Sequence, residues 1–168
     1  MKNPIVNISV TAAMVSIIGK MLYFIFLAPN ETFDTYTRFF YLLCFLIALF
    51  IGLRNWKLQN ANVAFTDDVK SGMKIVSIYA IILSSFTFVY YKYINPNYFL
   101  QKIQSAIDAV SASGSSNDEL NQVENTASFV FNAFTHSTLT LFGLMVIGFF
   151  YTLILILLFR YKPKAFGL

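Results

Sequence analysis

Four long apolar segments constrain the fold of this chain more than any other feature. Each is close to the roughly 20 residues that an α-helix needs to cross a hydrocarbon core about 30 Å thick. They cover residues 5–27, 36–53, 72–93 and 137–159, and Lys20 is the single charged residue inside the first. The pattern predicts an all-α membrane protein with four transmembrane helices.

The composition excludes most other classes of protein. Hydrophobic residues make up 57% of the 168 residues and charged residues only 12%, against roughly 25% charged in a typical globular chain. Apolar runs of this length cannot be buried in one water-soluble core, so a soluble enzyme and a disordered chain are excluded. Cys44 is the sole cysteine, which excludes a disulfide scaffold. We expect residues 1–168 to form a single integral membrane domain.

The distribution of lysine and arginine predicts the orientation, because cytoplasmic flanks retain positive charge. The opposite side of a four-span arrangement carries few cations, mixed with carboxylates, so both termini and the linker between the second and third spans should be cytoplasmic. A cleaved signal peptide is the alternative for the first segment, but that run is long and no A-x-A-like site precedes Pro29. The net charge of +4 indicates anchoring to anionic lipid and predicts no nucleic-acid partner. The cations on the cytoplasmic side are Lys2, Arg54, Lys57, Lys70, Lys74, Arg160, Lys162 and Lys164.

Residues 96–136, between the last two spans, predict an extracytoplasmic amphipathic helical hairpin. Two apolar stripes at helical spacing flank the small polar segment 111–116, and Ser116 and Glu119 have the spacing of a capping box. The second helix either stops before the last span or continues into it. The apolar face either covers lipid at the outer interface or docks a partner. The stripes are Phe99, Ile103, Ala106, Ile107 and Val110, then Leu120, Val123, Ala127, Val130, Phe131 and Phe134.

Several local motifs resemble a bacterial family of small four-span membrane proteins catalogued as domain of unknown function 4199. The segment FIGLRNWK at residues 50–57 resembles the family's end of the second span, and Phe65 and Gly72 resemble its short linker. The segment NPNYF at residues 95–99 and the acidic helix start after Ser116 resemble its outer loop. The resemblance implies a multi-pass protein of the bacterial inner membrane without an established activity. Because members are sometimes encoded beside polyprenyl-phosphate glycosyltransferases, it also implies an accessory role in envelope glycan assembly.

The sequence offers little material for catalysis or metal binding. His136 is the one histidine and precedes the fourth span, with neither a second histidine nor a cysteine pair to complete a metal site. We expect His136 to make interfacial hydrogen bonds and Cys44 to pack as a small apolar side chain. No cofactor and no metal are predicted.

Lys20 is the most informative single residue, because an ammonium group inside a bilayer costs about 2.5 to 3.5 kcal/mol on insertion scales. Its long stem can snorkel toward the outer interface or its ammonium can pair with Glu31 or Asp34. The alternatives are contact with an anionic group such as a lipid phosphate, and a proton or ion pathway.

The linker between the second and third spans is the other charged cluster. Its cations Arg54, Lys57, Lys70 and Lys74 either anchor the cytoplasmic side or form a basic platform for a phospholipid or polyprenyl phosphate. Thr66 is predicted to cap the third helix, and the carboxylates of residues 67 and 68 favour its N-terminus. A catalytic aspartate pair is disfavoured because adjacent helix residues point in different directions.

Small residues at helical spacing predict close helix packing. They let backbones approach where the bilayer gives helices no hydrophobic reason to associate, and the same faces can hold another protein. Trp56 is expected in the aromatic belt at the inner membrane boundary. The small residues are Ala12, Ser16 and Gly19 in the first span, Ser77, Ala80 and Ser84 in the third, and Gly148 and Thr152 in the fourth.

These features predict a non-enzymatic accessory or scaffold subunit of another membrane protein. The first alternative is a small binder or carrier of anionic or polyprenyl-phosphate lipid that uses Lys20, Arg54, Lys57, Lys70 and Lys74. The second alternative is a membrane enzyme on a lipid-linked substrate, with His136 as base. The predicted partners are the lipid bilayer and one further membrane protein.

Overall fold

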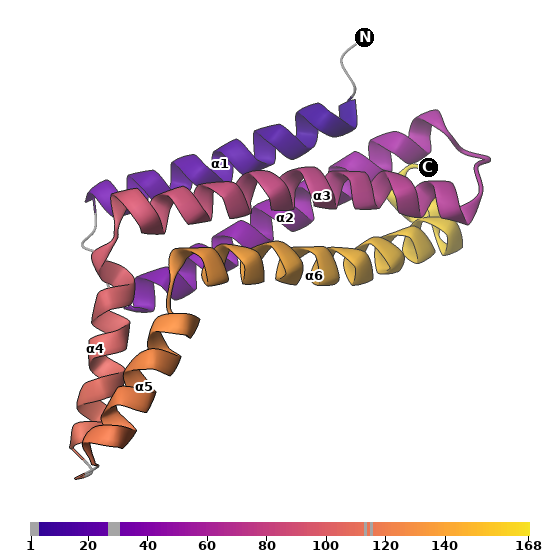
Figure 1. Ribbon diagram of the computed structural model, residues 1–168. Helices are drawn as coiled ribbons and strands as arrows, with labels where there is room; N and C mark the ends of the chain where they lie inside the picture. The colour runs from indigo at the N-terminus through magenta and orange to yellow at the C-terminus, as the bar shows by residue number, and fades with distance from the viewer. Residues whose placement is uncertain (1–3, 27–30, 113, 115) are drawn as a thin grey trace. The chain divides into compact units, whose positions relative to one another are not determined.

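All regular elements among the residues that the structure describes are helices (Figure 1). The computed structural model describes residues 4–26, 31–112, 114 and 116–168, with side chains described outside residues 31–35. The α-helices are α1 (Pro4–Phe26), α2 (Glu31–Gln59), α3 (Phe65–Val89), α4 (Asn97–Ser111), α5 (Asn117–Val130) and α6 (Ala133–Tyr161). A π-helix, η1 (Tyr90–Ile94), continues α3, and a 3₁₀ turn, η2 (Pro163–Phe166), follows α6.

The four predicted spans are confirmed. Among the described residues, four helical segments are long and apolar enough to cross a membrane: Pro4–Phe26, Tyr36–Gln59, Phe65–Ile94 and Ala133–Tyr161. The second and third helices run further than the apolar segments that predicted them, to Gln59 and from Phe65. Helical backbone can continue past the hydrocarbon because its hydrogen bonds are internal and polar side chains reach water.

The predicted cap of the third helix is wrong in its position. Helix α3 begins at Phe65, so Thr66 lies in the first turn rather than before it. The carbonyl oxygen of Ala64 accepts hydrogen bonds from the amides of Asp67 and Asp68, at 3.1 and 3.3 Å. Both carboxylates do stand in the first turn, where the helix dipole favours negative charge.

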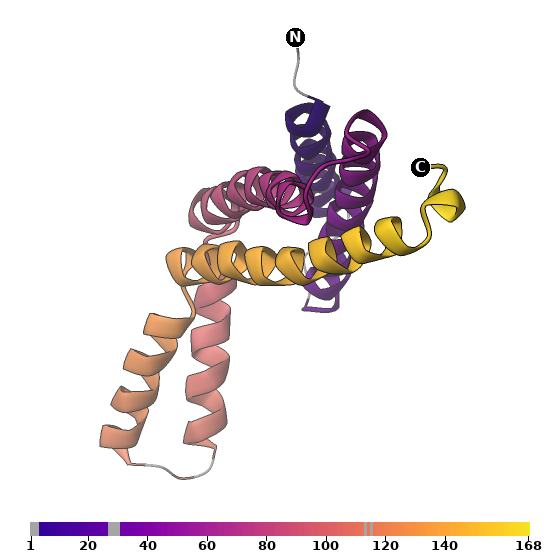
Figure 2. The ribbon, with the colours of Figure 1, turned by 90° about the vertical axis from the view of Figure 1, so that its right-hand side faces the viewer.

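The chain divides into two units, each with its own contacts. The first, which we call the span unit, contains the described residues up to Leu83 and those from Phe142 onward. Helix α1 packs along α2 (Figure 2), and fully buried side chains of α2 and α3 make most of the core. They are Phe45, Leu49, Leu53, Ile75, Val76, Tyr79 and Leu83.

Close approach of helices within the span unit depends on small residues. A Cβ atom at Gly148 of α6 would meet the side chains of Val76 and Phe45, and one at Gly72 of α3 would meet Thr152. By contrast, Gly143 of α6 has nothing within 4 Å of that position among the described residues. The predicted role of Gly148 and Thr152 in tight packing is therefore confirmed.

A buried tyrosine ties three helices of the span unit together. The Tyr79 hydroxyl of α3 donates to the Tyr41 carbonyl oxygen of α2 at 2.8 Å and lies 2.7 Å from the Ser16 hydroxyl of α1. Polar side chains of transmembrane helices gain from such bonds, because the alternative is an unpaired group in hydrocarbon.

The second unit, residues 84–141, contains the predicted helical hairpin. Helices α4 and α5 lie side by side (Figure 2), and Ser116 and Glu119 form the predicted capping box at the start of α5. The least exposed residues of the hairpin are the predicted stripe residues, among them Phe99 and Ala127. The stripes therefore cover each other, although Val130 and Phe134 stay exposed.

Helix α5 does not continue into the last span. Phe131 and Asn132 separate α5 from α6, and the Asn132 side chain serves both helix ends. Its amide nitrogen donates to the Phe129 carbonyl oxygen at 2.7 Å, and its oxygen accepts from the Thr135 backbone amide at 2.8 Å. An asparagine that satisfies both free ends stabilises the break.

Aromatic rings pack where the hairpin begins. The Tyr91 ring lies 4.8 Å from Tyr98, 4.9 Å from Phe99 and 5.0 Å from His136, measured between ring centroids. We call these four residues, together with Tyr90, the aromatic base. Their edge-to-face and tilted arrangements are those that aromatic pairs prefer.

Candidate functional site

Charged and polar side chains of the span unit gather where α2 ends and α3 begins. The carboxylate of Asp68 on α3 accepts from Lys57 Nζ at 3.0 Å and from Trp56 Nε1 at 3.2 Å, both on α2. It also accepts from Arg160 of α6, through Nε at 2.9 Å and Nη2 at 2.6 Å. We call these four residues the Asp68 cluster.

In the Asp68 cluster, the other three side chains surround one buried carboxylate. The Asp68 side chain is only 2% exposed, and Lys57 is 13% exposed. Arg160 also donates to the Val63 carbonyl oxygen and lies over the Phe65 ring at 5.6 Å. Charge-assisted bonds of this kind are stronger than neutral ones. The cluster joins three helices and carries one more positive than negative charge.

The neighbouring carboxylate has a different environment. Asp67 pairs with Lys70 at 3.2 Å, and the side chains are 46% and 77% exposed. Exposed ion pairs contribute little to stability. The prediction that the two aspartates point in different directions is confirmed, so they do not form a carboxylate pair.

The residues after α6 fold back onto α2. Arg54 of α2 donates from Nε to the Phe166 carbonyl oxygen at 2.9 Å. The Phe166 ring lies 5.0 Å from Phe159 and 6.1 Å from Phe50, between ring centroids. Arg54 is thus engaged within the chain.

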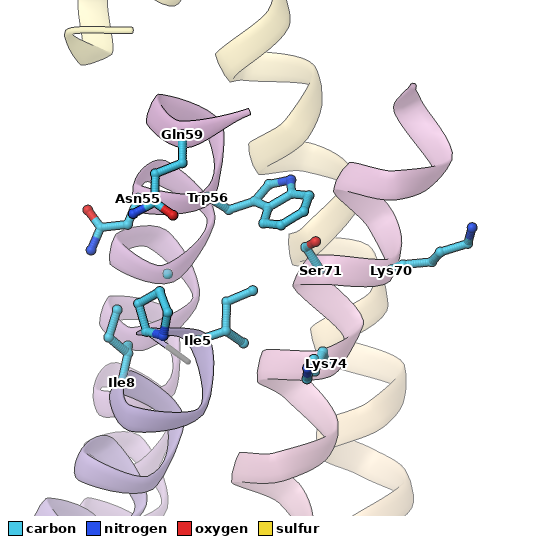
Figure 3. Close-up of a pocket in the computed structure, with 10 residues that line it drawn as sticks. Ile5, Ile8, Asn55, Trp56, Gln59, Lys70, Ser71 and Lys74 are labelled. Atoms are coloured by element: carbon cyan, nitrogen blue, oxygen red, sulfur yellow. The ribbon is translucent and has the colours of Figure 1, made fainter. Parts of the chain in front are cut away.

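A cavity of about 460 Å³ is lined by residues of α1, α2 and α3, among them Trp56 of the Asp68 cluster (Figure 3). We call it the Lys74 pocket. Ligand sites in proteins usually have volumes of about 300 to 1,000 Å³. Trp56 extends from α2 toward Ser71 on α3 and forms one wall (Figure 3). The lining residues are Pro4, Ile5 and Ile8 of α1, Gly52, Asn55, Trp56 and Gln59 of α2, and Lys70, Ser71 and Lys74 of α3.

The pocket is rich in hydrogen-bond donors. Within the described part of the chain, neither Lys74 nor the side-chain amides of Asn55 and Gln59 have a hydrogen-bond partner. Lys70 points away from α2 in Figure 3, and its side chain is 77% exposed and pairs with Asp67. Lys70 and Lys74 stand one helical turn apart. The arrangement suits an anion with several acceptor oxygens.

A comparison with protein families shows to which family the chain belongs. The family described as "Protein of unknown function (DUF4199)" matches residues 8–161. The chain belongs to the DUF4199 family. No curated protein and no solved structure matches it. Membership confirms the resemblance seen in the sequence and supplies no activity for this DUF4199 protein.

The structure separates the five lysines and arginines predicted to contact anionic lipid. Lys70 and Lys74 line one pocket of the DUF4199 protein, whereas Lys57 binds Asp68 and Arg54 binds the Phe166 carbonyl. Lys20 is 5% exposed in the C-terminal third of α1 and does not line the pocket. Its predicted pairing with Glu31 or Asp34 falls on side chains outside those described.

The other candidate side chains lie elsewhere. His136 packs in the aromatic base of the DUF4199 protein, against both Tyr91 and Phe99. Cys44 is a free cysteine of intermediate exposure in α2. Across the residues that the structure describes, His, Cys, Asp and Glu side chains form no group of three or more suited to a metal ion.

Two structural features of the DUF4199 protein near the pocket were not predicted from the sequence. The first is the partnership of Asp68 with Arg160, which lies 92 positions away along the chain. The second is the role of Trp56 as a pocket wall, because a tryptophan at a span end is normally a membrane anchor. For the first, the signal available in the sequence was an aspartate among several cations that are predicted to lie on one side of the membrane.

Proposed function

We propose that this DUF4199 protein binds the anionic phosphate headgroup of a membrane lipid in the Lys74 pocket. The observation that carries the proposal is a single cavity in which two lysines one turn apart meet uncommitted donors and an apolar wall. No reaction is assigned to the site. Its lining offers cations and donors but neither carboxylate nor imidazole.

The chemistry of the lining suits a phosphate ester. Phosphate oxygens only accept hydrogen bonds when ionised, and lysine binds them as a point charge. The Ser71 hydroxyl and the amides of Asn55 and Gln59 can add neutral donors. Pro4, Ile5 and Ile8 offer apolar surface to the first carbons of a lipid chain. The ligand class includes anionic phospholipids and polyprenyl phosphates.

The charge of this end of the span unit supports the proposal. Arg54, Lys57, Lys70, Lys74 and Arg160 outnumber the two carboxylates of residues 67 and 68. A local excess of one sign of charge raises the concentration of ligands of the opposite sign. The positive-inside rule assigns this end and both termini to the cytoplasmic side of a bacterial inner membrane, where anionic lipids are abundant.

A second candidate is the role of accessory or scaffold subunit for another membrane protein. Helix α6 favours it, because large apolar side chains such as Phe142, Val146 and Phe150 are exposed along it. Gly143 leaves open space on the same helix. A partner helix could pack there as closely as α3 packs at Gly148. Photo-crosslinking from Val146 in native membranes, with recovery of one stoichiometric partner, would support this role; crosslinks to lipid alone would contradict it.

The lipid proposal is tested by the headgroups that remain on the purified protein. The wild type, a Lys70→Gln/Lys74→Gln variant and a Lys162→Gln/Lys164→Gln control are compared in native mass spectrometry. Both variants lose two cations from the same unit, but Lys162 and Lys164 do not line the pocket. With about 1 kcal/mol for each cation near a charged surface, the pocket variant should bind phosphatidic acid about 2 kcal/mol, or roughly thirtyfold, more weakly.

Three outcomes distinguish the sources of the phosphate. Retention of polyprenyl phosphate or phospholipid by the wild type and control alone supports the proposal. If inorganic phosphate displaces the bound lipid from the wild type as readily as added lipid does, the ligand is a soluble phosphate instead. Equal lipid binding by all three proteins would overturn the assignment of the pocket.

A further inference from the structure

The Trp56 indole stands between the Lys74 pocket and the Asp68 carboxylate. It lines the pocket on one side, together with Ser71 and Lys74. On its other side it borders a small space enclosed by Lys57, Asp68 and Phe159. The ring is half-buried, and its N–H donates to Asp68. The position of one wall of the pocket therefore depends on a contact outside the pocket.

Asp68 is well suited to hold that ring in place. Its carboxylate is 2% exposed and is also bound by Lys57 and by two nitrogens of Arg160. The side chain thus cannot rotate without breaking several charge-assisted bonds. An indole N–H that donates to such a fixed acceptor loses its freedom to swing, and a pre-ordered wall lowers the entropy cost of binding.

We propose that Asp68 is the positioning residue of the Lys74 pocket, holding Trp56 as its wall and coupling headgroup binding to the attachment of α6 through Arg160. This inference rests on the proposed function. Asp68 does not touch the ligand, because it lines the neighbouring space and not the pocket. By linkage, whatever loosens the end of α6 at Arg160 weakens the site, and a bound headgroup strengthens that attachment equally.

The direction in which one substitution changes anion affinity distinguishes a positioning role of Asp68 from a simple effect of its charge. Asp68→Asn removes a negative charge near an anion site, which by charge alone should tighten anion binding. Loss of the fixed acceptor should instead weaken binding. Asp67→Asn is the charge-matched control, since Asp67 is the next residue but pairs only with exposed Lys70 among the side chains described. Its removal should leave binding unchanged or tighter.

The experiment uses the full chain in phosphatidylcholine nanodiscs titrated with short-chain phosphatidic acid, with the bound fraction read by native mass spectrometry. Asp68→Asn weakens the charge-assisted hydrogen bond that holds Trp56. Because such a bond contributes strongly to stability, the variant should bind phosphatidic acid about tenfold more weakly than the wild type. Trp56 is the only tryptophan in the chain, so its emission in lipid without phosphatidic acid reports the wall directly. The emission should shift in Asp68→Asn and not in Asp67→Asn.

A double-mutant cycle with Trp56→Phe removes the ambiguity of a folding defect. Without the indole there is no ring for Asp68 to hold, so Asp68→Asn should cost about twofold or less in the Trp56→Phe background. A misfolded variant would lose binding equally in both backgrounds, and that equality would overturn the proposal.

The remaining outcomes are also decisive. If the wild type binds and Asp68→Asn binds as tightly as Asp67→Asn, the positioning role is wrong while the proposed function stands. If the wild type shows no preference for phosphatidic acid over phosphatidylcholine, the proposed function falls, and the coupling falls with it. The emission comparison still decides whether Asp68 holds Trp56.

Discussion

The Asp68 cluster and the aromatic base are organised by different forces. In the cluster, one buried carboxylate accepts hydrogen bonds from three side chains at 2.6 to 3.2 Å. In the aromatic base, rings pack at centroid distances of 4.8 to 5.6 Å around Tyr91 and Phe99. The first depends on direction and charge, whereas the second depends mainly on filled volume.

The contrast predicts different tolerance to substitution. Removing one partner from a buried ion cluster leaves charge without compensation, which costs far more than the intact pair contributes. Volume-conserving changes among packed apolar side chains usually cost less than about 1.5 kcal/mol. The Asp68 cluster should therefore be the more fragile region, although the aromatic base contains more aromatic rings.

The largest effect is expected at Arg160. Arg160→Gln removes two of the four donors to Asp68 and the bond to the Val63 carbonyl oxygen. Because Arg160 is partly exposed, we expect a loss of about 3 kcal/mol, the low end for a broken buried pair. Thermal unfolding in detergent measures it. Lys162→Gln, on an exposed neighbour, is the control and should stay within about 0.5 kcal/mol. Equal stability of the two variants would show that the cluster does not hold α6.

An intermediate effect is expected where spans pack through glycine. Gly148→Val would drive a side chain into Val76 and Phe45, and such overpacking costs about 1 to 3 kcal/mol. Gly143→Val makes the same change in the same helix, where nothing described lies within 4 Å. The difference in unfolding midpoint between the two variants isolates the packing cost. Equal unfolding midpoints would mean that moving α3 and α6 apart at Gly148 costs no stability.

The sequence predicted the elements well because their signals are local. Span length comes from hydropathy, and the capping box of Ser116 and Glu119 comes from a fixed spacing. The sequence did not decide whether α5 stops before α6, because apolar residues lie on both sides of Asn132. Its side chain serves two helix ends at once, which a periodicity argument does not detect.

The candidate site was less predictable because it is assembled from distant parts of the chain. The sequence identified Arg54, Lys57, Lys70 and Lys74 as one basic platform. Acceptors elsewhere decided which of these cations remain available. Lys57 binds Asp68 and Arg54 binds the Phe166 carbonyl oxygen. Lys70 and Lys74 line the pocket, and Lys70 also forms an exposed ion pair with Asp67. Charge and spacing predict that these cations share a membrane side, but only tertiary structure shows where their acceptors lie.

The smallest effect is expected in the aromatic base. Phe99 is buried against Tyr91 and His136, so Phe99→Leu keeps most of the buried apolar volume and loses only ring contacts. The loss should be below about 1.5 kcal/mol. Hydrogen exchange of α4 amides measures it locally, with Leu100→Ala on the exposed face as control. A loss larger than that of Arg160→Gln would reverse the comparison. The ring geometry around Tyr91 would then be as specific as the bonds around Asp68, and the hairpin would depend on the orientation of its rings rather than on their volume.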